Sequence, residues 1–87
     1  MAKVYIPALL RELTGGVEVV DVDGATVRAV IGNLEQAFPG IGGRLMDGER
    51  LRPNISVAVD GEISPVGLLE GVGAGSEVHF ITAIKGG

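Results

Sequence analysis

The stretch TVRAVIGNLEQAFPG, residues 26–40, predicts the one long helix around which this chain must fold. Its apolar residues recur at intervals of three and four, as in an amphipathic helix. Thr26 is placed to cap the helix by accepting hydrogen bonds from backbone N–H groups of its first turn, and Pro39-Gly40 ends it. The helix therefore presents one apolar stripe, formed by Val27, Val30, Ile31, Leu34, Ala37 and Phe38.

Two strand-like segments precede this helix. Residues 3–8 alternate in hydropathy, with Pro7 near the end of the run, and residues 17–22 are rich in β-branched side chains. Thr14-Gly15-Gly16 lies between them and is typical of a turn. The two segments are therefore predicted to pair as an antiparallel hairpin.

Further strand signals follow the helix. Residues 55–59 carry apolar side chains at period two, and Asp60-Gly61 predicts a two-residue turn into a short return strand at Glu62-Ile63. Residues 77–82, EVHFIT, form the last predicted strand. The connection at 40–53 is predicted to be a loop with a helical turn at 41–46, and the glycine-rich segment 65–78 is expected to tuck Leu68, Leu69 and Val72 beneath it.

These elements predict an α+β fold. With a single long helix, the simplest two-layer solution lays its apolar stripe across one face of a mixed sheet of four to five strands. The first and last strands can then pair in parallel in the middle of the sheet. Residues 1–82 are predicted to form one domain, and residues 83–87 a flexible tail ending in Gly-Gly.

Composition excludes several classes of partner. The chain of 87 residues has a formal net charge of -4, opposite in sign to what contacts with a nucleic-acid backbone require. It has no cysteine, and hence no disulfide, thiolate metal site or catalytic thiol, which fits the cytoplasm. Neither a signal peptide nor a membrane span is apparent, so the protein is expected to be cytoplasmic, without a membrane or nucleic-acid partner.

Motifs that could support catalysis are weak. His79 is the only histidine, and no cysteine can pair with it, so it is interpreted as a half-exposed strand residue. The acidic and glycine segments at 21–24 and 71–75 are interpreted as turns, because their spacing fits neither a calcium loop nor a phosphate-binding loop. The acidic pairs Asp47/Glu49 and Asp60/Glu62 are expected to be solvated. The chain is therefore not expected to be an enzyme or to bind a metal.

The end of the chain is the more informative feature. HFITAIKGG, residues 79–87, finishes on Gly86-Gly87, although glycine adds no packing and loses the most conformational freedom when it is fixed. A frayed polar end is the ordinary interpretation of such a terminus. Here, however, a strand of the EVHFIT type precedes the diglycine, and an arrangement of two strands, a helix and further strands stands upstream.

This combination resembles the ThiS/MoaD family of ubiquitin-like sulfur carriers, whose β-grasp domain ends in an exposed Gly-Gly. DGATVRAVIGNLEQAFPGI is similar to the family's helix, and GAGSEVHFITAIKGG to its last turn and strand. PALLRELTGG and GRLMD, residues 43–47, are similar to the carriers that serve cysteine synthesis. The chain departs from the family at residues 82–85, where members often have proline and small residues, and at Ser76, where an acidic residue is common.

The resemblance implies a function for the terminus. A partner of the ubiquitin-activating type would adenylate Gly87 with ATP and Mg²⁺, and sulfur would then displace AMP to leave a thiocarboxylate. A sulfur-accepting synthase, in cysteine or molybdopterin synthesis, would be the second partner. Gly86, Lys85 and Ile84 would form the tail that enters the partner, Ile81 and the adjoining Phe80 would contact it, and the carrier itself would bind no cofactor and be a monomer when free.

Two other functions remain open from the sequence. A ubiquitin-like modifier would use the same acyl-adenylate but would join Gly87 to a lysine of another protein. A plain interaction domain would have an inert terminus. Thiazole synthesis and tRNA thiolation also accept sulfur from similar carriers.

Overall fold

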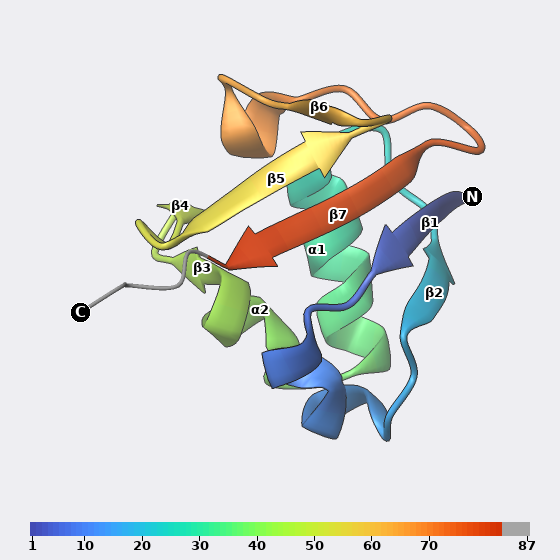
Figure 1. The fold of residues 1–87 in the computed structure, drawn as a ribbon, viewed down its shortest axis with the longest axis vertical. Helices are drawn as coiled ribbons and strands as arrows, with labels where there is room; N and C mark the ends of the chain where they lie inside the picture. The colour runs from blue at the N-terminus through green and yellow to red at the C-terminus, as the bar shows by residue number, and fades with distance from the viewer. Residues whose placement is uncertain (83–87) are drawn as a thin grey trace.

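A computed structural model describes residues 1–82, which form a mixed sheet with one main helix across one face (Figure 1). The five strands of the sheet stand in the order β2-β1-β7-β5-β6. The first and last strands, β1 and β7, pair in parallel at its centre, which confirms the prediction. The strand bounds are β1 Ala2–Tyr5, β2 Val19–Val22, β5 Ile55–Val59, β6 Glu62–Ile63 and β7 Glu77–Thr82. The predicted tail, residues 83–87, lies outside the described residues.

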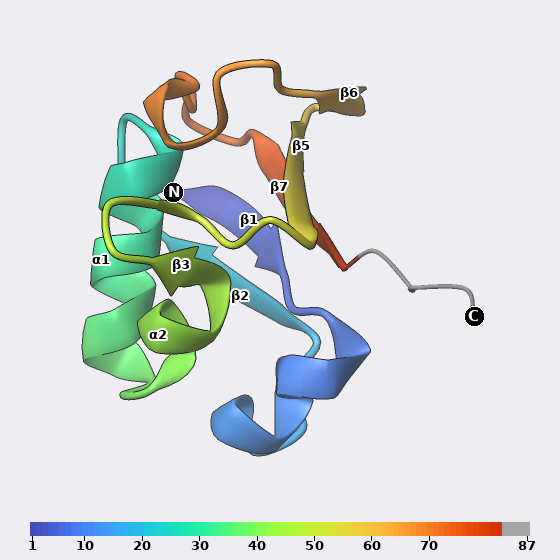
Figure 2. The same cartoon turned by 90° about the vertical axis from the view of Figure 1, so that its left-hand side faces the viewer.

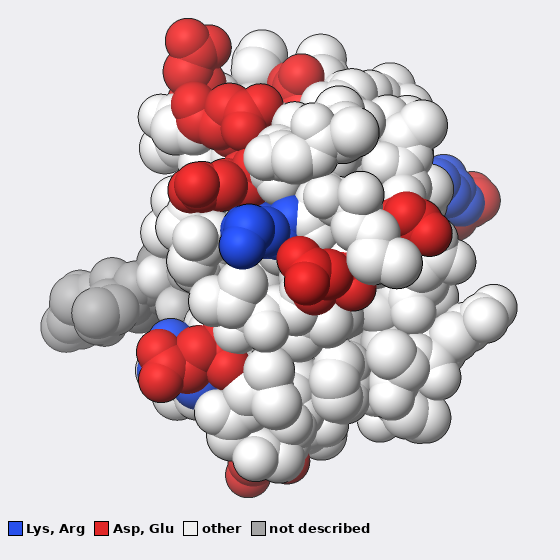
Figure 3. All heavy atoms as spheres, turned by 90° about the vertical axis from the view of Figure 1, so that its right-hand side faces the viewer, with Lys and Arg blue, Asp and Glu red and all other residues white. Residues whose placement is uncertain are grey.

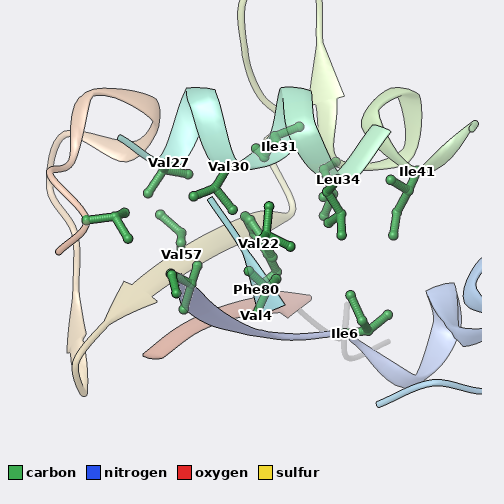
Figure 4. Close-up of a cluster of buried hydrophobic side chains, with 14 of the residues drawn as sticks. Val4, Ile6, Val22, Val27, Val30, Ile31, Leu34, Ile41, Val57 and Phe80 are labelled. Atoms are coloured by element: carbon green, nitrogen blue, oxygen red, sulfur yellow. The ribbon is translucent and has the colours of Figure 1, made fainter. Parts of the chain in front are cut away.

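Helix α1, Val27–Ala37, begins and ends where the sequence indicated. The Thr26 hydroxyl accepts a hydrogen bond from the backbone N–H of Ala29 at 3.2 Å, which satisfies one donor of the first turn. The predicted stripe enters the core, although Ala37 is exposed and Phe38 only half-buried. Figure 4 shows side chains of α1 pointing toward those of the sheet, and the buried core includes Val4, Ile6, Val22, Val27, Val30, Ile31, Leu34, Ile41, Val57, Val78 and Phe80.

Gly24 explains the sharp turn between β2 and α1. Its φ is 154°, and a Cβ added there would lie 2.7 Å from the backbone nitrogen of Val30. Only glycine lets the chain pass this close to the helix backbone. The Asn33 amide donates to the carbonyl of Asp23 at 2.7 Å and holds the same turn. Residues 21–24 therefore span the end of β2 and the predicted turn into the helix.

The β1–β2 connection contains an element for which the sequence has no clear signal. Residues Ala8–Thr14 form a 3₁₀ helix, η1, which ends at Gly15 with a φ of 65°. β1 stops at Tyr5, short of the predicted residue 8, because Pro7 has no N–H to donate to a sheet and instead precedes the first turn of η1. The predicted antiparallel pairing itself is confirmed, with Tyr5 opposite Val19.

The segment after α1 is more ordered than the predicted loop. The expected helical turn is α2, Ile41–Leu45, and it is followed by a small antiparallel hairpin of β3, Met46–Asp47, and β4, Arg50–Leu51. Figure 2 shows this segment beside α1, on the side of the sheet that α1 covers. The hairpin was missed because strands of two residues are too short to display a period.

Glu35 joins the end of α1 to the start of α2. Its carboxylate accepts hydrogen bonds from the backbone N–H groups of Gly40, at 2.9 and 3.1 Å, and of Gly42, at 2.7 Å. A Cβ at position 42 would lie 2.9 Å from Oε1 of Glu35, so glycine permits this close approach. The bonds from Gly40 and Gly42 hold the pKa of the Glu35 carboxyl below its ordinary value of 4.5, against a smaller opposing effect of desolvation.

We expect Glu35→Gln to lower the melting temperature at neutral pH, because the amide is a weaker acceptor than the carboxylate. A carboxyl whose pKa is lower in the folded state stabilises that state above its unfolded pKa, and this stabilisation is lost as the pH falls through the folded pKa. The deficit of the variant should therefore shrink as the pH falls below about 4.5. Thermal melting across pH checks this, with Glu62→Gln, an exposed carboxylate of β6, as the control. A deficit that stays constant with pH would contradict the assignment.

The glycine-rich segment before β7 packs as predicted at two of three positions. It contains a 3₁₀ turn, η2, Gly67–Leu69, and buries Leu68 and Val72. Leu69 is 75% exposed, so its predicted burial is wrong. A 3₁₀ turn as short as η2 directs few side chains toward the core. Leu68 is the one that is buried, and Leu69 faces outward.

Candidate functional site

The strand that leads to the diglycine lies in the middle of the sheet. β7 pairs with β1 in parallel and with β5 in antiparallel fashion, from Val59 opposite Val78 to Ile55 opposite Thr82. Its direction is therefore fixed on both sides by backbone hydrogen bonds. The tail residues of the predicted site, Ile84, Lys85, Gly86 and Gly87, come after Thr82 and Ala83 in the sequence and lie outside the described residues.

Asp60 and Ser76 anchor the beginning of β7. The Ser76 hydroxyl donates to Oδ2 of Asp60 at 2.9 Å, and the backbone N–H of Glu77 donates to Oδ1 at 3.0 Å. Asp60 itself adopts a φ of 52° and, with Gly61, makes the predicted two-residue turn. Ser76, where the sequence departs from the family pattern, is thus a buried residue that ties β7 to the β5–β6 turn.

The two predicted partner contacts on β7 face opposite sides of the sheet. Phe80 is only 5% exposed and packs in the core beneath α1, so its side chain presents almost no surface to the predicted partner. Alternate residues of a strand point to opposite faces, and position 80 shares the core face with Val78. Ile81 is 43% exposed and pairs with Ser56 on the other face.

That other face carries a row of mostly apolar side chains, interrupted by His79, across all five strands. Tyr5 stacks on His79, with ring centroids 4.0 Å apart and planes 7° from parallel. The register continues the row to β2 on one side and to β5 and β6 on the other, where Ile63 is 65% exposed. The outer row is formed by Val19, Tyr5, His79, Ala58 and Ile63. Ile81 extends it toward the tail, and no helix of residues 1–82 covers it (Figure 2).

Acidic side chains lie at the end of the sheet away from the tail. Asp60 lies in the β5–β6 turn, Glu62 begins β6, and Glu77 begins β7. Figure 3 shows acidic side chains gathered toward the upper end of the molecule in that view. On its exposed face, β7 therefore begins with the acidic Glu77 and continues through His79 to the apolar Ile81.

The remaining predicted positions have structural contacts. His79 is half-exposed, as predicted, and its Nε2 lies 3.7 Å from a Glu77 oxygen. Glu49, of the β3–β4 hairpin, pairs with Arg28 at 3.0 Å. Within residues 1–82, no group of three or more His, Cys, Asp or Glu side chains is arranged to hold a metal ion. Over the same range, the helices are too short or too polar to cross a membrane.

Comparison with known proteins identifies this arrangement as the ubiquitin-like β-grasp fold. A chain of the crystal structure of the Amycolatopsis orientalis BexX/CysO complex superimposes with a TM-score of 0.92, at 37% identity and with all of both chains covered. SAMP1 from Haloferax volcanii superimposes with a TM-score of 0.75, at 32% identity, over 99% of this chain and 98% of the other. The predicted fold class is confirmed.

The chain belongs to the ThiS family, whose model matches residues 4–87. Sulfur carrier protein CysO of Mycobacterium tuberculosis is 36% identical over 89 residues, which cover 97% of this chain and 96% of that protein. The CysO of Mycobacterium bovis matches to the same extent. The resemblance inferred from the diglycine and the helix is therefore confirmed, including its leaning toward this group of carriers.

Proposed function

We propose that this protein is a sulfur carrier that transports sulfur as a thiocarboxylate on Gly87. The observation that carries the proposal is the family match, which runs through the final diglycine to relatives named sulfur carrier proteins. The central position of β7 supports it, because a strand bonded on both sides is a rigid base from which to present a terminus.

The chemistry requires activation because a carboxylate is a poor electrophile. An oxygen of the Gly87 carboxylate attacks the α-phosphorus of ATP and releases pyrophosphate, which gives an acyl-adenylate. A sulfide sulfur then attacks the carbonyl carbon, the bond to the AMP oxygen breaks, and AMP leaves. ATP and Mg²⁺ serve the activating enzyme, so the carrier contributes the reacting carboxylate and no resident cofactor. The need for ATP fits the cytoplasm.

A tail whose last two residues lack side chains is suited to enter an activating enzyme. Glycines at 86 and 87 present no side chain to an enclosed active site and accept the backbone angles that such a site imposes. Ordering the backbone of a tail residue costs about 1–2 kcal/mol. Contacts made by the folded body must offset that cost, with Ile84 as a further apolar anchor in the tail.

The outer row and Ile81 are the surface that we propose for docking the activating enzyme. Exposed apolar surface beside polar residues is typical of protein interaction sites. The structural relative from Amycolatopsis orientalis was crystallised as a BexX/CysO complex, which supports a protein partner for this fold. A sulfur-accepting synthase, of cysteine synthesis first and of molybdopterin synthesis second, would use the loaded tail afterwards.

Protein modification is a second candidate function. SAMP1 of Haloferax volcanii, a small archaeal modifier protein, shares the fold at 31–32% identity. A modifier also begins from an acyl-adenylate, but a lysine amine then attacks the carbonyl and forms an isopeptide bond. The two functions therefore differ only in the nucleophile that meets Gly87.

Mass spectrometry of cell extract is expected to find the free protein with one terminal oxygen replaced by sulfur. Thiocarboxylates hydrolyse, so the extract should be analysed rapidly, with a Gly87-deletion strain as the control. Branched Gly-Gly peptides on lysines of other proteins, in the absence of the sulfur-bearing species, would instead establish modification and refute sulfur carriage.

A further inference from the structure

A hollow of about 310 Å³ lies at the tail end of β7. Thr82, the last described residue of the strand, forms part of its wall. η1 contributes Leu9, which is 70% exposed, and the other side is lined by Arg44 of α2 and by Arg52 and Asn54 between β4 and β5. We call this feature the arginine hollow. It is separate from the outer row, because it lies beyond the end of the strands, whereas the row crosses their exposed face.

The local charge of the arginine hollow is opposite to that of the whole chain. Two guanidinium groups line it in a protein with a formal net charge of -4. An acidic residue, Glu12, forms a long ion pair with Arg44, with 3.8 Å between Oε1 of Glu12 and Nη1 of Arg44. Both side chains of this pair are exposed to solvent. Exposed pairs of this kind contribute little, so a better-placed carboxylate can replace Glu12 at small cost.

The backbone holds the Arg52 side chain and the helix that carries Arg44. Nε and Nη2 of Arg52 donate to the carbonyl oxygen of Gly43 at 3.0 and 2.7 Å, which ties the β4–β5 connection to α2. The Glu35 carboxylate fixes the start of α2 through Gly40 and Gly42. A guanidinium has five N–H donors, and these bonds use two of those on Arg52. The Arg52 charge is thus presented from a restrained position, which reduces the entropy lost when a ligand binds, and Arg44 extends from an anchored helix.

We infer that the arginine hollow docks an apolar segment bearing a carboxylate, on the activating enzyme that receives the tail. This inference rests on the proposed function. A protein that receives residues 83–87 must lie beside Thr82, and hence beside this hollow. Guanidinium groups bind carboxylates in a bidentate geometry, and the exposed Leu9 offers the apolar contact next to them. The hollow thereby supplies an electrostatic contact at the tail, in addition to the apolar contact of the outer row.

Charge reversal tests the inference. Arg44→Glu is expected to weaken binding to the activating enzyme by about tenfold in calorimetry, and the wild-type affinity should fall more steeply with added salt than that of the variant. The matched control is Arg28→Glu on α1, which changes the net charge equally but pairs with Glu49 away from the hollow. Leu9→Asp, on the other wall, should also weaken binding and does not alter either arginine.

The outcomes separate this inference from the proposed function. ATP–pyrophosphate exchange with the wild-type protein, measured in the same series, tests activation by itself. If exchange is at the wild-type level and both Arg44→Glu and Leu9→Asp bind with unchanged affinity, the docking role of the arginine hollow is refuted. The proposed function would not be affected by that result. Equal weakening by Arg28→Glu and Arg44→Glu would also overturn it, because net charge would then explain the effect. Melting curves establish that each variant is folded.

Discussion

Deletion of Gly87 is expected to abolish ATP–pyrophosphate exchange by the activating enzyme while leaving the melting temperature unchanged. The deletion moves the terminal carboxylate back by one residue, about 3.3–3.6 Å in an extended chain, so it no longer reaches the α-phosphate of bound ATP. Misplacement of a reacting group by even 1 Å can cost about a hundredfold in rate. The folded body should be unaffected, because among the described residues the core extends from Ala2 to Phe80.

A glycine substitution elsewhere in the chain is the matched control for this deletion. Gly32 lies in the middle of α1, and an added Cβ there would meet nothing within 4 Å. Gly32→Ala should therefore keep both the fold and the exchange activity. Normal exchange by the protein that lacks Gly87 would show that the terminal carboxylate is not the activated group, and the proposed function would then be abandoned.

Ile81→Asp is expected to weaken the complex with the activating enzyme by about 2 kcal/mol, or roughly thirtyfold in Kd. Ile81 adjoins the outer row and is the exposed apolar residue of β7 nearest the tail. A carboxylate placed there would have to lose its hydration against an apolar partner surface. Calorimetry with the purified enzyme measures the change, and thermal melting shows whether the variant remains folded.

The control for this variant is Leu69→Asp. Leu69 is 75% exposed on η2, away from the outer row, so the same change of charge and size there should leave affinity unchanged. If Ile81→Asp binds with wild-type affinity, then Ile81 lies outside the interface. Equal losses from both variants would point to repulsion by net charge in place of a local contact.

The sequence was most informative where a local pattern has a single structural solution. The stripe and the Thr26 cap defined α1 because helical spacing and capping act within a few residues. Asp60-Gly61 defined the β5–β6 turn for the same reason, since few residue pairs adopt two consecutive positive φ angles. The central pairing of β1 with β7 was also predicted, because one helix and a mixed sheet leave few ways to cover the core.

Errors arose where the outcome depends on residues distant in the sequence. Alternation along β7 puts Phe80 and Ile81 on opposite faces of the sheet, but the packing of α1 on one of these faces is what buries Phe80. Leu69 was expected to be buried but faces outward from η2, beside the buried Leu68. The outer row itself comes from five strands, and its register was not available from any one of them.

By itself, the sequence determined the helix, the strand directions and the diglycine that carries the proposed chemistry, because capping, periodicity and a terminal motif are properties of neighbouring residues. Only the tertiary structure decided which side chains meet around the tail. Leu9, Arg44 and Arg52 come from three separate segments, and they share one hollow with Thr82 because η1, α2 and the β4–β5 connection all pack at the same end of the sheet.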